Sequence, residues 1–151
     1  MRFRGLALLA LVAAPLAAQG PRGVELGVTG VAAWADPAWT GGGLSLGLRP
    51  GGRVRMVLAA LAGDAAGLTG RGELTGQYLL WPGRLTGVGA YAFGGVAGQA
   101  GERDAGYVVL GLGLEGRPGA ASGWHLEAGI GGGARVAVGW RWRRLRPAGR
   151  G

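Results

Sequence analysis

The residues best suited to acid–base chemistry are His125, the single histidine of the chain, and Glu127. Residues two apart in a β-strand lie on the same face, so this imidazole and this carboxylate would be neighbours. With a serine as nucleophile such a pair could support hydrolysis, and the chain has two serines, Ser45 and Ser122. A histidine held for structural reasons in a polar interior explains the same pattern, and we favour that interpretation.

The remaining composition predicts neither a cofactor nor a metal. The chain contains no cysteine, no lysine and one histidine, which excludes a thiolate metal site and a Walker-type phosphate loop. The glycines of 111–116 match a dinucleotide-binding spacing, but they lie in a predicted strand, whereas that motif must lead into a helix. The formal net charge is +8, yet the arginines are scattered along the chain, so nucleic acid is not an expected partner.

A repeated stop signal defines the elements that would hold these residues. Four stretches of alternating apolar residues each end in a tetrapeptide with proline and glycine or alanine, which punctuate secondary structure. One strand up, a connection and one strand down fit between successive stops, so the sequence predicts four β-hairpins. The stops are Arg49-Pro50-Gly51-Gly52, Trp81-Pro82-Gly83-Arg84, Arg117-Pro118-Gly119-Ala120 and Arg146-Pro147-Ala148-Gly149. Tight turns are expected at the stops, and longer, more polar loops at 35–41, 63–71 and 98–106.

Eight strands follow from this division, and seven of them alternate with a period of two residues. The exception is the strand at 88–97, which is apolar on both faces, so the sequence leaves its orientation open. Eight strands of this length can close into a small barrel. The predicted strands are 24–34, 43–49, 53–61, 72–81, 88–97, 107–115, 123–131 and 134–143.

The first residues have the pattern of a cleavable signal peptide. Arg2 and Arg4 precede an apolar run at 6–14, and small residues precede Gln19. That run is too short for a spanning helix, which needs about 20 apolar residues. The sequence therefore predicts a signal peptide at 1–18, export through the secretory pathway, a β-barrel domain at 19–145 and a basic tail at 146–151.

Periodicity alone leaves two barrels open: a soluble one that buries its apolar face and a membrane one that turns that face to lipid. The tryptophans favour the membrane, because aromatic side chains are enriched at bilayer interfaces. The opposite face consists of glycine, alanine and isolated charges, which suits the crowded interior of a small barrel. The expected interface aromatics are Trp34, Trp81, Trp124, Trp140 and Trp142, with Trp81 off the apolar face.

Taken together, these features resemble the small eight-stranded outer-membrane β-barrel proteins of Gram-negative bacteria. The resemblance covers the signal peptide, the four glycine-rich hairpins and the aromatic final strand 135–142, which is similar to the segment read by the barrel assembly machinery. It implies an all-β, antiparallel, up-and-down transmembrane β-barrel in the bacterial outer membrane, with the stops at the periplasmic rim. The implied partners are outer-membrane lipids, lipopolysaccharide and, during biogenesis, the assembly machinery; the implied state is a monomer.

In such a barrel the charged residues of the alternating strands point into the lumen. A charge removed from water is costly unless it is paired, so we expect these residues to form an ion-pair network that plugs the lumen and prevents conductance. Closure of the barrel predicts a pair between Glu25 and Arg141, and an arginine of the last strand near Glu127. The predicted network comprises Glu25, Arg55, Glu73, Glu115, His125, Glu127, Arg135 and Arg141.

The leading functional hypothesis is a non-enzymatic structural or interaction protein of the outer membrane. One alternative is an outer-membrane lipid hydrolase; among similar barrels, the lipid A deacylases carry a serine two residues after the catalytic histidine, where this chain has Glu127. Another is a soluble secreted barrel that binds a small apolar ligand. Trp39, in the first expected loop, is a candidate contact for lipopolysaccharide sugars or a protein partner, or a cap on the barrel rim.

Overall fold

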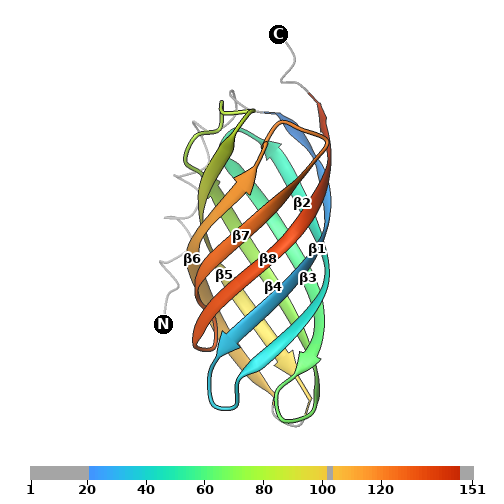
Figure 1. Cartoon of the computed structure of the whole chain (residues 1–151), viewed down its shortest axis with the longest axis vertical. Helices are drawn as coiled ribbons and strands as arrows, with labels where there is room; N and C mark the ends of the chain where they lie inside the picture. The colour runs from blue at the N-terminus through green and yellow to red at the C-terminus, as the bar shows by residue number, and fades with distance from the viewer. Residues whose placement is uncertain (1–20, 102–103, 147–151) are drawn as a thin grey trace, which may run out of the picture.

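The computed structural model describes residues 21–101 and 104–146; the predicted signal peptide and all but the first residue of the predicted tail lie outside this range. Its eight strands form a closed antiparallel barrel in which each strand pairs with the next and β8 pairs with β1 (Figure 1). The predicted all-β, antiparallel, up-and-down barrel is confirmed. No helix in the described part of the chain is long and apolar enough to cross a membrane. The strands are β1 (Arg22–Trp34), β2 (Trp39–Gly51), β3 (Val54–Asp64), β4 (Leu68–Leu79), β5 (Val88–Ala100), β6 (Ala105–Gly116), β7 (Ser122–Ile130) and β8 (Ala134–Arg146).

The alternating pattern places the large aliphatic side chains on the outside of the barrel. Leu26 of β1, Leu58 of β3 and Leu112 of β6 are all exposed, and their neighbours in sequence point inward. The inward face carries glycine, small residues and the buried charges, together with two apolar clusters that contain Trp39 and Leu61 in one and Tyr91, Phe93 and Val109 in the other. The sheet is therefore apolar outside and places its charges inside, the reverse of a water-soluble barrel.

The orientation of β5, which the sequence left open, is set by Tyr91 and Phe93, both of which point into the lumen. The Tyr91 hydroxyl donates a hydrogen bond to Glu127 at 2.9 Å, a partner that the outer surface would not supply. Gly113 lies opposite Tyr91 on β6, and the missing side chain leaves room for the phenol ring. A buried hydroxyl that needs a partner thus decides between two apolar faces.

The connections differ from the expected pattern of tight turns at the stops and longer loops elsewhere. The turn at Trp81-Pro82-Gly83-Arg84 extends beyond the end of β4, with the Arg84 amide donating to the Trp81 carbonyl at 3.0 Å. The expected longer loops are wrong, because the backbone ladders continue through glycine-rich segments: Asp64 pairs with Leu68 and Ala33 with Trp39. The connections at the stops are 52–53, 80–87 and 117–121, and those at the opposite end are 35–38, 65–67, 101–104 and 131–133.

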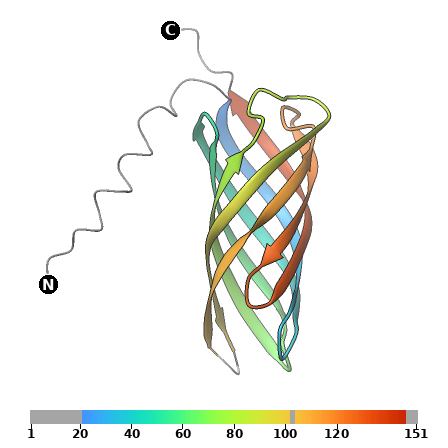
Figure 2. The ribbon, with the colours of Figure 1, turned by 90° about the vertical axis from the view of Figure 1, so that its left-hand side faces the viewer.

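An even number of strands returns both ends of the described chain to one end of the barrel (Figures 1 and 2). We call this end, where the three internal stops also lie, the terminal rim, and the opposite end the loop rim. The exposed charges of the described residues are divided between the two rims. The terminal rim carries Arg22, Arg53, Arg84, Arg117, Arg144 and Arg146, and the loop rim carries Asp36, Asp64 and Asp104.

Candidate functional site

Arg55 is the centre of an ion-pair cluster inside the barrel near the terminal rim. Its side chain is 0% exposed, and its Nη1 donates to Glu25 at 3.1 Å and to Glu115 at 2.9 Å. Its Nε donates to the Gln77 side-chain oxygen at 2.7 Å. These contacts join β1, β3, β4 and β6, so one guanidinium spans the lumen.

Further arginines surround the two carboxylates of this terminal cluster. Arg143 lies 3.0 Å from Glu115 and 3.8 Å from Glu25, and Arg49 lies 3.5 Å from Glu25. The expected pair between Glu25 and Arg141 is wrong: the register of β1 and β8 places Glu25 opposite Arg143. Arg141, two residues earlier, instead approaches Glu115 at 3.7 Å.

A second cluster occupies the lumen towards the loop rim and is built around Glu127 and Glu73. Arg135 bridges them, donating to Glu127 at 2.9 Å and to Glu73 at 2.8 Å. Arg141 also donates to Glu127, at 3.3 Å, so the expected contact between Glu127 and arginines of the last strand is present. Arg71 donates to Glu73 at 2.9 Å.

The two clusters are connected through Gln77 and Arg141. The Gln77 amide accepts from Arg55 and donates to Glu127 at 3.2 Å, while Arg141 reaches a glutamate of each cluster. Among the described residues, the buried charged side chains are six arginines and four glutamates, so positive charge is in excess inside the barrel. Several guanidinium nitrogens consequently have no hydrogen-bond partner among the described residues, on Arg49, Arg55, Arg135, Arg141 and Arg143.

His125 lies in the lumen beside a small void and not on the outer surface. It is 2% exposed, and its Nε2 is 3.3 Å from the Thr29 hydroxyl. The void, about 20 Å³, is also lined by Ser45 and Glu127, and its size suits one water molecule. Within the described residues, no hydrogen bond joins His125 to Glu127, Ser45 or Ser122, so the serine–histidine–acid arrangement of a hydrolase is not assembled.

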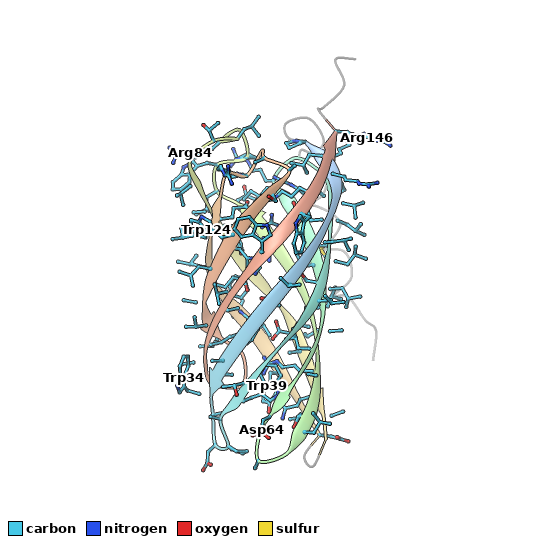
Figure 3. The ribbon with its side chains drawn as sticks, turned by 45° about the vertical axis from the view of Figure 1, so that its right-hand side comes forward. Trp34, Trp39, Asp64, Arg84, Trp124 and Arg146 are labelled. Carbon is cyan, nitrogen blue, oxygen red and sulfur yellow. The ribbon has the colours of Figure 1, made fainter. Side chains whose placement is uncertain are left out.

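At the loop rim the lumen widens into a cavity of about 540 Å³, which we call the vestibule. Trp39 was expected in an exposed loop, and this is wrong: it begins β2, is 2% exposed and points into the lumen (Figure 3). Gly41 and Gly63 leave room for its indole ring, and the Arg71 guanidinium lies 5.3 Å from that ring. Tyr107 lies 5.4 Å from the same guanidinium. The vestibule is lined by Asp36, Trp39, Arg71, Gln99, Asp104 and Tyr107, together with small residues.

The barrel is similar to solved structures of known membrane barrels. It matches the N-terminal β-barrel domain of Pseudomonas aeruginosa OprF with a TM-score of 0.65 and 17% identity, over 83% of this chain and 100% of that one. It matches Neisserial surface protein A with a TM-score of 0.54 and 10% identity, over 80% of this chain and 96% of that one. It matches the de novo designed TMB2.3 with a TM-score of 0.52 and 17% identity, over 82% and 95%. No family model and no curated protein matches the sequence.

The chain has the fold of a small eight-stranded outer-membrane β-barrel. The outward tryptophans of that barrel are unevenly distributed: Trp124 lies towards the terminal rim and Trp34 near the loop rim (Figure 3). Trp140 pairs with Trp124 across β7 and β8, and Trp142 follows towards the terminal rim. Trp81, in the turn after β4, is exposed at that rim too and lies 5.3 Å from the Arg84 guanidinium. Four of the five expected interface aromatics therefore lie on the terminal side.

The barrel lumen also contains residues that the expected network left out. The alternation of apolar residues does place Arg49 and Arg143 on the inward face. Arg71 precedes Glu73 by two residues and therefore shares its face. Alternation gave no signal for Tyr91, because both faces of β5 are apolar. Trp39 was missed because the glycines that follow it were interpreted as loop.

Proposed function

We propose that this chain is an integral protein of the bacterial outer membrane, with a structural or interaction role and a lumen that does not conduct. The observation that carries the proposal is the network centred on Arg55. A fully buried guanidinium that binds carboxylates from opposite sides of the barrel leaves little room for a continuous water path. The two clusters follow one another along the axis, so an ion would have to displace both.

Placement in a membrane is supported by the outer surface. Large apolar side chains are exposed along every strand, and a water-soluble barrel would aggregate through such a surface. The longest connections, 80–87 and 117–121, lie at the terminal rim, so loop length does not support a periplasmic terminal rim. The orientation rests instead on the position of the described chain ends: only hairpin tips need to cross the bilayer if the terminal rim stays in the periplasm. The terminal-rim arginines then face phospholipid headgroups, and the loop-rim half of the surface faces lipopolysaccharide.

Conductance tests the closed lumen. The purified barrel is inserted into planar lipid bilayers, and single-channel current is recorded over a range of voltages. We expect no stable current steps. Arg55→Ala combined with Glu115→Ala removes the central bridge and should produce steps or current noise, which shows that the assay can detect an open lumen. Stable steps with the unmodified protein would overturn the proposal.

Fractionation tests the location. The full chain is expressed in a Gram-negative host, membranes are separated by density, and the outer-membrane fraction is run boiled and unboiled on a gel. We expect recovery with the outer membrane and a mobility difference caused by the intact barrel. Recovery in the soluble periplasmic fraction would contradict the proposal and favour a soluble barrel.

The two alternatives receive less support from the geometry. A soluble carrier of an apolar ligand needs an apolar cavity, whereas the middle of this lumen is filled by ion pairs and leaves a void of only about 20 Å³. A lipid hydrolase needs its catalytic groups at the lipid surface, whereas His125 is buried in the lumen. Turnover of radiolabelled lipid A or phospholipid that disappears in a His125→Ala variant would nevertheless establish the enzyme.

A further inference from the structure

The vestibule contains an arginine that is held in a fixed position. The Nε of Arg71 donates to Glu73 at 2.9 Å, and its Nη2 donates to the Gly131 carbonyl at 2.9 Å. The rings of Trp39 and Tyr107 lie 5.3 Å and 5.4 Å from the guanidinium. These hydrogen bonds leave Nη1 for a ligand, and a preorganised guanidinium binds a carboxylate with little loss of side-chain entropy.

A second donor in the same cavity has no partner. Trp39 is 2% exposed and lines the vestibule, and its indole Nε1 makes no hydrogen bond to any described residue. Buried donors are nearly always satisfied, so an unpaired one calls for an explanation. An oxygen of a ligand bound to Arg71 would supply the missing acceptor.

The described charged residues at the mouth of the vestibule have the opposite sign. Asp36 and Asp104 line the same cavity but are exposed, whereas Arg71 is buried. Asp104 accepts from the Gly101 amide through Oδ1, at 3.4 Å, so its Oδ2 remains for a ligand. A simple anion would be repelled by these carboxylates on entry, and a simple cation would be repelled by Arg71 at the floor.

We propose that the vestibule binds a small zwitterion, an amino acid or a short peptide with free ends. Its carboxylate lies at Arg71 and the Trp39 indole N–H, and its ammonium lies between Asp36 and Asp104. A cavity of about 540 Å³ is within the range of small-molecule sites and is large enough for a short peptide. This assigns a binding site to a barrel whose lumen we propose to be closed, and it holds whether or not the lumen conducts.

Calorimetry with three matched peptides tests the charge requirement. The folded barrel in detergent is titrated with trialanine, with N-acetyl-trialanine and with trialanine amide, which remove one terminal charge each. We expect binding of the free tripeptide and binding about tenfold or more weaker for each capped form. Equal affinities for the three peptides, or no heat with the free tripeptide at millimolar concentration, would overturn the proposal.

Variants at the loop rim then locate the site. Asp36→Asn combined with Asp104→Asn should weaken binding of the free tripeptide, whereas binding of the anionic N-acetyl form should stay the same or become tighter, because the repelling carboxylates are gone. Trp39→Phe removes the indole N–H donor but keeps a smaller aromatic ring beside Arg71, and it should weaken both the free and the N-acetyl peptide by about threefold to tenfold. Asp64→Asn, on the same rim but outside the vestibule, is the control, and boiled and unboiled gel mobility shows that each variant is folded. If Asp64→Asn lowered the affinity for the free tripeptide as much as the double variant does, the effect would come from the overall charge of the rim, and the proposed site would be overturned.

Discussion

On β3, Arg55 and Leu58 lie three residues apart and face opposite environments. Arg55 is 0% exposed in the lumen, bound by carboxylates and an amide from three other strands, whereas Leu58 is 55% exposed on the outer surface. An inner side chain is fixed by particular partners, and an outer one only by its apolar character. The inner face should therefore tolerate few substitutions, and the outer face should tolerate any apolar residue but no charge.

The largest effect is expected for Arg55→Leu. Removing the guanidinium leaves the buried carboxylates of Glu25 and Glu115 with reduced compensation, and breaking such a buried pair lowers the free energy of unfolding by about 3–5 kcal/mol. Urea unfolding in lipid vesicles, followed by gel mobility of the intact barrel, measures the change. Arg53→Leu is the control, because Arg53 is exposed at the terminal rim and should change the value by less than about 0.5 kcal/mol.

A charge on the outer face should cost slightly less. Leu58→Arg, near the middle of β3, should lower the free energy of unfolding in a bilayer by about 2–4 kcal/mol, because arginine is unfavourable at the bilayer midplane. Leu68→Arg, at the first residue of β4 where the side chain is 84% exposed, should cost about 0–1 kcal/mol. Equal effects at the two positions would argue against a membrane around this surface.

Loss of a carboxylate from the loop-side cluster ranks third. Glu127→Ala removes the acceptor of Arg135, Arg141 and Tyr91, and should lower the free energy of unfolding by about 1.5–3 kcal/mol, the contribution of a hydrogen bond to a charged group. Each arginine keeps a second glutamate, which limits the loss. Asp104→Ala, an exposed carboxylate, should have almost no effect, and an unchanged unfolding midpoint for Glu127→Ala would contradict the network.

The smallest change in the free energy of unfolding is expected for alanine substitutions at two glycines, one inside the barrel and one outside. A Cβ at Gly113 would overlap the ring of Tyr91, so Gly113→Ala should lower the free energy of unfolding by about 1–3 kcal/mol through overpacking. A Cβ at Gly98, on the outer face, meets nothing within 4 Å, so Gly98→Ala should be neutral or slightly stabilising. An unchanged free energy of unfolding for Gly113→Ala would show that the Tyr91 ring can move aside, and it would contradict tight packing at this position.

The strands and their faces could be predicted because a period of two residues is visible in the sequence. The ion-pair partners could not, because shifting one strand by two residues leaves every side chain on its face: Glu25 lies opposite Arg143 and not Arg141, and alternation cannot distinguish these registers. The vestibule was missed for another reason. Trp39 begins a segment rich in glycine, and glycines do not show which face of a strand points inward. A continuing strand and a loop therefore look alike in the sequence.

The division of charge between the rims bears on how the barrel can enter a bilayer. In the orientation that we propose, the hairpin tips of the loop rim traverse the hydrocarbon, while the terminal rim remains on the side of departure. Placing an arginine at the bilayer midplane costs about 2–4 kcal/mol, and an aspartate costs less. Among the described residues, the exposed arginines belong to the rim that stays behind in this orientation and the exposed aspartates to the rim that crosses. Arg103 and Glu102, in the connection 101–104, lie outside the described residues. For the charges of the described residues, insertion in the proposed direction therefore has a lower barrier than the reverse.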